Sequence, residues 1–203
     1  MITLCELTSA QIVSKSRSSG SFSRYASRNG INRVNVSRVG LLDIKEGSDD
    51  LSIFFYVNSA TRPSEKYRVD IRIVDFIDHL REYAHKLDTN ITIKRLIQNI
   101  RPFFNEELKK AEIKINCACP DFLFRFKDAA RSQKFYFGID DSDEARGPNS
   151  NKINPHYEGS ACKHILRILT RPSLWYEKVL RTLSNVLKNY NSVLVKTLDI
   201  PFD

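Results

Sequence analysis

Two short pairs of metal-type ligands are the part of this sequence best suited to chemistry: Cys-x-Cys at 117 and 119, and Cys-x-His at 162 and 164. Together the pairs supply three thiolates and one imidazole. Four Cys or His ligands satisfy the tetrahedral preference of a structural zinc ion and leave no position for water. We therefore predict one closed zinc site, bound by Cys117, Cys119, Cys162 and His164. The alternative is that these are small side chains that merely fill a core.

The segments around the two pairs favour the metal site. The first pair follows the strand-like residues 113–116, and in an extended segment residues i and i+2 point to the same face. The second pair opens an apolar-periodic run at 165–169, which predicts a helix. Backbone N–H groups at a helix start favour a thiolate over a thiol. We therefore expect a strand and a helix to present the two pairs to one ion.

The spacing Cys117-x-Cys119-Pro120, followed by Cys162-x-His164, resembles the SWIM zinc finger, whose pattern is CxC, a variable spacer and CxH. The match covers residues 113–170, and the 42 residues between Cys119 and Cys162 make a longer spacer than is usual in SWIM modules. The resemblance implies that all four residues bind one zinc ion. SWIM modules occur in transposase-like, ubiquitin-ligase-like and chromatin-remodelling proteins and are thought to bind DNA or protein.

A second, looser resemblance lies in the residues that surround the ligand pairs. The stretch 115–122, Ile-Asn-Cys-Ala-Cys-Pro-Asp-Phe, with the later Cys162-Lys163-His164, looks like small proteins of large tailed bacteriophages. This resemblance implies a virion protein, for example of the neck or head–tail connector.

Length and composition bound the class of protein. The 203 residues can form one substantial core or two small domains, and 41% hydrophobic residues indicate a folded chain. No stretch approaches the 18 or so apolar residues of a membrane span. The first 15 residues are too polar for a signal peptide, so we expect a protein of the cytoplasm or the virion that is not secreted. In a reducing compartment, cysteines serve more often as metal ligands than in disulfides.

The excess positive charge lies at the two ends of the chain. Of a net charge of +8, residues 1–46 and 162–203 each contribute seven Lys or Arg against three Asp or Glu, while residues 47–161 hold eighteen of each sign. Basic terminal segments are typical of nucleic-acid contact and also fit an acidic protein surface.

Residues 1–30 are predicted to form a basic, serine-rich arm that the fold does not need. No acidic residue occurs between 7 and 42. The arm could become ordered on DNA phosphates or between neighbouring subunits, or it could be a solvated tail. The side chains expected to contact nucleic acid or a partner are Lys15, Arg17, Arg24, Arg28, Arg33 and Arg38.

Residues 31–112 predict a small antiparallel β-meander packed with helices. Strand patterns cover 31–42, 51–57 and 67–73, joined by short turns. Helical spacing follows at 76–84 and from about Thr92, where Pro102 is expected to kink or restart the helix. With the strand–helix zinc module at 113–171, which carries a long polar insertion, the fold class is α+β.

Two further features are aromatic residues after Cys119 and a row of apolar residues near the C-terminus. Phe122, Phe124 and Phe126 alternate, and a second aromatic cluster covers 135–137; core positions are favoured over base stacking. Residues 172–203 predict one long C-terminal helix and a tail. The apolar seam of this helix recurs at Tyr176, Val179, Leu183, Val186, Tyr190 and Val193. It could face the protein's own core or a helix of another chain.

No catalytic constellation is visible: the sequence has no glycine-rich phosphate loop, no GxSxG and no HExxH. Two hypotheses follow. The first is a non-enzymatic, zinc-stabilised assembly protein of a phage head–tail region, with copies of itself or other virion proteins as partners in a ring-like assembly. The second is a DNA-binding SWIM protein that contacts phosphates through its basic ends.

Overall fold

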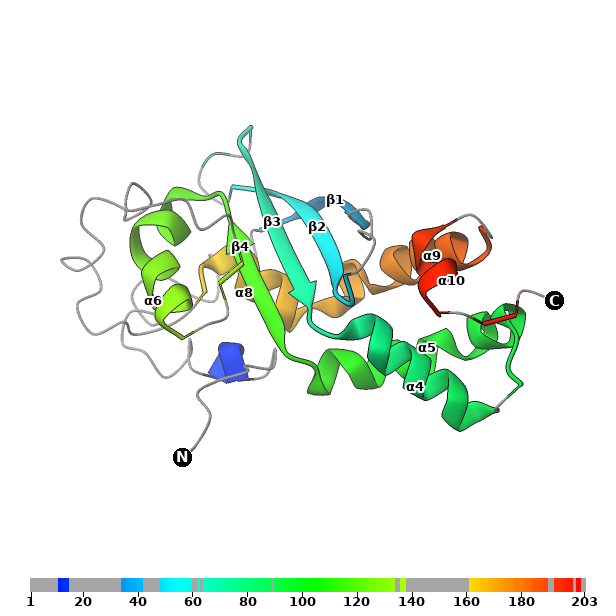
Figure 1. Cartoon of the computed structure of the whole chain (residues 1–203). Helices are drawn as coiled ribbons and strands as arrows, with labels where there is room; N and C mark the ends of the chain where they lie inside the picture. Colours follow the sequence, from blue (N-terminus) through cyan, green and yellow to red (C-terminus); the bar gives the residue numbers. More distant parts are fainter. Residues whose placement is uncertain are drawn as a thin grey trace, which may run out of the picture.

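The computed structural model describes residues 11–14, 34–41, 48–59, 62, 64–88, 90–133, 136–137, 161–189, 192–198 and 200–201. The strands are β1 (Val36–Leu41), β2 (Leu51–Asn58), β3 (Lys66–Ile73) and β4 (Ile113–Cys117). The helical elements are α4 (Phe76–Leu87), α5 (Ile93–Lys110), the π-helical turn η1 (Phe122–Phe126), α6 (Lys127–Ser132), α8 (Lys163–Thr170), the 3-10 turn η3 (Pro172–Leu174), α9 (Tyr176–Leu187) and α10 (Val193–Leu198). This mixture of an antiparallel sheet and helices confirms the predicted α+β class (Figure 1).

The sheet is an antiparallel meander in the order β1-β2-β3-β4. Side chains of β2 alternate between buried and partly exposed, because successive residues of a strand point to opposite faces. The three predicted strands are confirmed. The strand at 113–117 pairs with β3 through Ile71 and Ile115, so the sheet continues across the boundary expected between residues 112 and 113.

Helices cover the apolar face of this sheet. Figure 1 shows α8 passing behind the strands, with α4, α5, α9 and α10 grouped beside one end of the sheet. Helix α8 contacts β4, α9 contacts β1 and α5, and α10 contacts α4 and α9. Buried side chains from all of these elements belong to one hydrophobic cluster. The described parts of the expected segments therefore share a single core.

The two helices of the middle segment begin as their sequences indicate. Asp75 precedes α4 in a left-handed conformation (φ 53°), and its backbone N–H donates to Asp50 Oδ1 (3.1 Å). Thr92 caps α5, since its hydroxyl oxygen accepts from the backbone N–H of Arg95 (3.4 Å). Pro102 lies inside α5, which is assigned as one helix from Ile93 to Lys110. Of the two expected effects of Pro102, a kink or a restart of the helix, the restart is therefore wrong.

The C-terminal segment differs from the single long helix that we expected. Helix α9 ends at Leu187, and α10 starts at Val193 after a turn in which the N–H of Ser192 donates to the carbonyl of Asn189 (2.9 Å). The hydroxyl of Ser192 then accepts from the N–H of Val195 (3.3 Å). Asn and Ser favour turns and caps over helix interiors, and this preference divides the periodic run.

The seam of α9 faces the protein's own core. Val179 and Leu183 are buried with relative exposures of 1% and 0%, and Val186 and Tyr176 pack against the same cluster. Tyr190 lies outside the described residues. Of the two interpretations of the seam, packing in the protein's own core is therefore confirmed for Val179 and Leu183, and a contact between chains is wrong for them.

The aromatic residues after Cys119 are mainly structural. Phe122 and Phe126 are buried, whereas the side chain of Phe124 is 42% exposed. The three rings lie on a π-helical turn, whose wider winding separates Phe124 from the other two. Of the second cluster, Tyr136 packs against the core, while residue 135 is outside the described part of the chain.

The described part of the expected arm, residues 11–14, contributes Ile12 to the core. Residues 11–14 are helical, and Ile12 within them is fully buried in the common core. The expected arm thus has at least one apolar side chain in the core, which opposes the expectation that the fold does not need residues 1–30. The rest of this segment, 1–10 and 15–30, lies outside the described residues, as does the insertion at 138–160.

Candidate metal centre

The four predicted ligands meet in one cluster. Their ligand atoms all lie within 4.8 Å of one another, and all four residues are buried with relative exposures of 0–1%. The Nδ1 atom of His164 is 4.0 Å from Cys117 Sγ and 3.9 Å from Cys162 Sγ. The three cysteines form no disulfide. The cluster can hold a metal ion, and the residues that the sequence placed together are confirmed as neighbours.

Strand β4 positions the first ligand. Ile113, Ile115 and Cys117 alternate as buried side chains, so the thiol of Cys117 points to the apolar side of the sheet. Cys117 pairs with Val69 of β3, and the N–H of Ala118 donates to the carbonyl of Arg68 (2.9 Å). The ladder therefore fixes the backbone up to the residue between the two thiols.

A helix start positions the second ligand. The carbonyl of Cys119 accepts from the N–H groups of Phe122 (3.0 Å) and Leu123 (3.1 Å), which makes it the first acceptor of the helical turn that begins at Pro120. Proline suits this first position because its ring fixes the backbone angle that a helix needs. Cys119 Sγ also accepts from the N–H of Phe122 (3.3 Å) and so occupies the place of a capping side chain.

Helix α8 positions the other pair. Cys162 is its N-cap residue, with an extended backbone, and His164 lies in its first turn. The helix is held by the buried side chains of Ile165, Leu166 and Ile168. Hydrogen bonds fix it further: Arg167 Nε donates to the carbonyl of Val34 (3.1 Å), and Trp175 Nε1 donates to that of Ile168 (3.0 Å). The centre therefore joins two elements that the rest of the fold already holds.

The thiols influence one another strongly. Neighbouring S–H groups of Cys117 and Cys162 donate toward Cys119, which lowers the pKa of the Cys119 thiol. Burial raises the pKa of Cys117 and of Cys162, because a thiolate is costly in an apolar environment. One thiolate is thus favoured in the cluster, and a bound cation would favour all three.

The geometry fits a tetrahedral ion. Bonds of about 2.3 Å to sulfur and about 2.0 Å to nitrogen place those ligand atoms about 3.6 Å apart around a tetrahedral centre. The distances of 3.9 and 4.0 Å from His164 Nδ1 to two of the sulfurs are close to this separation. On the other side of the ring, the buried Nε2 has no hydrogen-bond partner among the described residues. The imidazole is therefore oriented by packing and through Nδ1.

Two neighbours of the centre were not indicated by the sequence. The ring of Tyr67 lies against that of His164, with centroids 5.1 Å apart, and its hydroxyl donates to Glu65 Oε2 (2.6 Å). Burial raises the pKa of Asp121, and the Cys119 sulfur adds to this increase while Arg125 opposes it. Tyr67 is distant in sequence and is brought to the centre only by the pairing of β3 with β4.

The basic residues expected to contact nucleic acid or a partner are placed only in part. Arg38 lies on β1 with an exposed side chain. Those that lie outside the described residues are Lys15, Arg17, Arg24, Arg28 and Arg33. Of the six, only Arg38 thus has a position, and it lies on the sheet.

Comparison with known proteins found no similar protein for this chain. No protein-family model, no curated protein and no solved structure matches this chain. Among the described residues, no helix has both the length and the apolar character needed to cross a membrane. Functional conclusions therefore have to come from the cluster and the surfaces of the chain itself.

Proposed function

We propose that this chain is a non-enzymatic assembly protein stabilised by a structural zinc ion. The observation that carries the proposal is the burial of all four candidate ligands at 0–1% exposure, with their ligand atoms within 4.8 Å of one another. Catalytic zinc keeps one position for water or substrate, whereas structural zinc is closed by four protein ligands. A buried set of four donors supports the structural role.

Zinc is the ion that suits these donors best. Three sulfurs and one imidazole nitrogen are soft and borderline ligands, which disfavour calcium and magnesium, and a tetrahedral arrangement of this kind is typical of zinc. The resemblance of the CxC and CxH pairs to the SWIM zinc finger supports the same ion. In this proposal Cys117, Cys119, Cys162 and His164 hold the zinc, which polarises no substrate.

The zinc would act as a staple between β4 and α8. The two ligand pairs are separated by 42 residues, so one ion connects the edge of the sheet to a helix that is distant in sequence. From α8 the chain passes through η3 into α9, which packs on β1 and α5. The staple would therefore help to set the path of the C-terminal helices over the sheet.

Cobalt substitution tests whether the centre is closed. Co²⁺ replaces zinc at tetrahedral sites and gives visible absorption bands that report the number and type of ligands. We expect the bands of a four-coordinate, sulfur-rich site, unchanged when azide is added. A spectrum that changes with azide would reveal an exchangeable position and would contradict a purely structural centre.

The assembly part of the proposal comes from the resemblance to phage proteins. That resemblance and the basic charge at both ends of the chain support a component of the head–tail region that contacts copies of itself or other virion proteins. Quantitative mass spectrometry of particles purified from the system that encodes the chain tests this role. We expect a fixed copy number per particle, and absence of the chain from particles would contradict it.

DNA binding through the basic ends is the second candidate function. The exposed position of Arg38 on β1 favours it, as does the net charge of +8. A gel shift with duplex DNA that disappears steeply as salt increases would support this role, because phosphate contacts release counterions. No shift at low salt would exclude it.

A further inference from the structure

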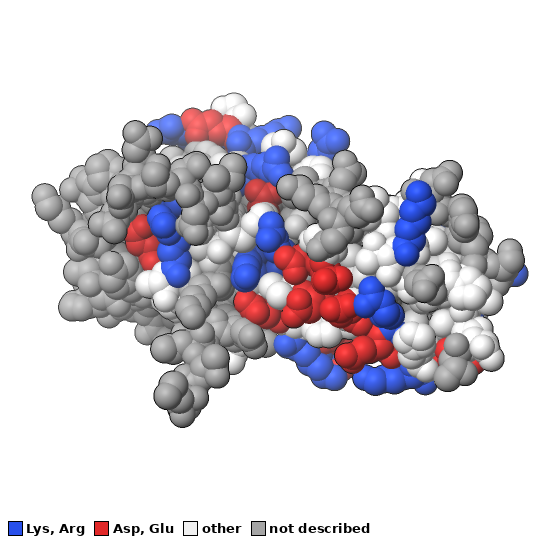
Figure 2. All heavy atoms as spheres, viewed as in Figure 1, with Lys and Arg blue, Asp and Glu red and all other residues white. Residues whose placement is uncertain are grey.

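The face of the sheet turned away from the helices is basic. By the strand register, Arg38 of β1, Lys66, Arg68 and Arg72 of β3, and Lys114 of β4 all point to this face. Among the described strand residues, Asp70 is the one acidic side chain on this face. Figure 2 shows Lys and Arg over the sheet, and acidic side chains that gather from the end of the sheet toward α4, with further Lys and Arg beside them. On the described strands, cations therefore outnumber the one acidic side chain of this face by five to one.

Few of these cations are neutralised within the protein. Arg68 bonds to Asp70 (2.8 Å), and Arg72 lies 3.4 Å from Asp50 at the end of the sheet. Among the described residues, no acidic group lies within salt-bridge distance of Arg38, Lys66 or Lys114. A surface salt bridge network does not explain why three cations share this face.

Aromatic rings stand between the cations. Phe54 and Tyr56 of β2 are partly exposed on this face, with ring centroids 6.1 Å apart. The guanidinium carbons of Arg38 and Arg68 lie 5.9 and 5.7 Å from the centre of the Phe54 ring. The core uses the opposite face of the sheet, so it does not require aromatic residues here.

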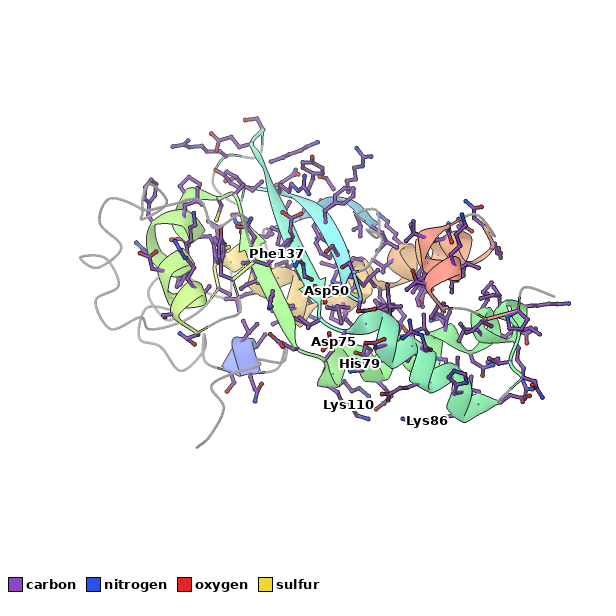
Figure 3. The ribbon with its side chains drawn as sticks, in the orientation of Figure 1. Asp50, Asp75, His79, Lys86, Lys110 and Phe137 are labelled. Carbon is purple, nitrogen blue, oxygen red and sulfur yellow. The ribbon has the colours of Figure 1, made fainter. Side chains whose placement is uncertain are left out.

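Two features extend this aromatic and basic surface. The ring of Phe54 lies close over Gly40 on β1, where a Cβ atom would be 2.5 Å from the ring. At the other edge, the N–H of Phe137 donates to the carbonyl of Ile115 (3.1 Å), and the Arg72 guanidinium lies 4.2 Å from the Phe137 ring. Figure 3 shows Phe137 beside β3 and β4. Aromatic and guanidinium groups therefore span the sheet from β1 to beyond β4.

We propose that this face binds single-stranded nucleic acid. Aromatic rings offer stacking surfaces that accept any base, while Lys and Arg contact the phosphates. Neighbouring strands are about 4.8 Å apart, so the cations of β1, β3 and β4 form an array about 15 Å wide. A broad, flat array suits a strand whose bases are turned outward better than the groove of a duplex. The inference is independent of the metal centre.

Fluorescence anisotropy with labelled oligonucleotides of about 20 nucleotides, longer than the site of one small domain, tests this binding. Oligothymidine and oligouridine distinguish DNA from RNA, and either one binding supports the proposal. The variant Arg38→Ala with Lys114→Ala should reduce the slope of affinity against salt by about 1.4, because each phosphate contact on a single strand contributes about 0.7. Tyr56→Leu should weaken binding about 5- to 150-fold through the loss of one stacked base.

Two control variants remove the same charge from other parts of the chain. Lys86→Ala with Lys109→Ala changes exposed side chains of α4 and α5, and Arg17→Ala with Arg24→Ala changes the basic N-terminal segment. We expect both to bind nearly as tightly as the unchanged protein. Loss of binding in the N-terminal variant alone would assign binding to that segment and overturn the proposal.

Further outcomes would also overturn it. These are no binding to either oligonucleotide at about 50 mM salt, a duplex that binds as tightly as the single strands, or polyglutamate that competes as well as oligothymidine. Circular dichroism confirms that each variant is folded. If the sheet variant is unfolded, Lys66→Glu replaces it, since Lys66 is exposed at the start of β3.

Discussion

The most informative perturbation is Cys119→Ser. Cys119 occupies the capping position before the helical turn at Pro120, and its sulfur accepts from the N–H of Phe122 (3.3 Å). Serine is a favourable N-cap residue, so the substitution can keep this hydrogen bond and removes mainly the metal ligand. The loss of stability should therefore come mainly from the metal, with a smaller part from the buried hydroxyl.

The size of the effect follows from binding linkage. An ion that binds only the folded state stabilises it by about 4.1 kcal/mol when free metal is about 1,000 times the dissociation constant. For a chain of this length, about 1 kcal/mol corresponds to a shift of roughly 2–4 °C in melting temperature. Because α8 contributes Ile165, Leu166 and Ile168 to the shared core, loosening it should affect the whole transition. We expect the melting temperature to fall by about 8–16 °C.

Metal analysis and calorimetry measure the two consequences together. The unchanged protein should contain one zinc per chain, and the Cys119→Ser protein much less. Cys5→Ser is the matched control, since Cys5 is the one cysteine of the chain outside the cluster. If Cys119→Ser retains one equivalent of zinc and melts at the same temperature, the proposed centre is refuted.

Four further outcomes can be measured by thermal melting or metal titration. Leu183→Ala should destabilise the fold by about 2–5 kcal/mol with zinc content unchanged, since Leu183 is fully buried; a melt within 1 °C or so of the unchanged protein would contradict its core position. Ile12→Ala should cost a similar amount, which an unaffected melt would disprove. Gly40→Ala should cost about 1–3 kcal/mol through its clash with Phe54, and Phe54→Leu should recover part of it. Apparent metal affinity should decrease as the pH falls, because burial raises the pKa of Cys117 and its proton must leave when metal binds; a pH-independent affinity would oppose this.

Regular elements with a strict period were predictable from local sequence. The strand at 66–73 was predictable from its alternating apolar and charged residues, and α4 from apolar residues with the helical period. The strand at 51–58 was predictable from its β-branched and aromatic residues, but its alternation between buried and partly exposed side chains is visible only in the structure. The prediction of one long C-terminal helix failed because it followed the apolar period and not the turn preference of Asn and Ser. The seam after Pro172 continues in sequence, but Asn189 and Ser192 form a turn that ends one helix before the next.

For the candidate centre too, the sequence predicted one part and the structure added another. The types and spacing of Cys117, Cys119, Cys162 and His164 identified the set, because few patterns other than a metal site bring three cysteines and a histidine into two matched pairs. Sequence alone did not show Tyr67 against the imidazole or the orphan Nε2 of His164. These depend on which side chains the sheet and α8 bring together.

The sequence by itself determined the α+β class, the main strands and helices, and the four residues of the candidate centre, because these depend on short-range period, cap and ligand spacing. Only the tertiary structure decided that β4 joins the meander and that Ile12 belongs to the core. It also decided that Arg38, Arg68 and Lys114 share one face with Phe54 and Tyr56. Each of these is a contact between residues far apart in the chain, and such contacts are selected by the burial of the whole apolar surface, which no local pattern specifies.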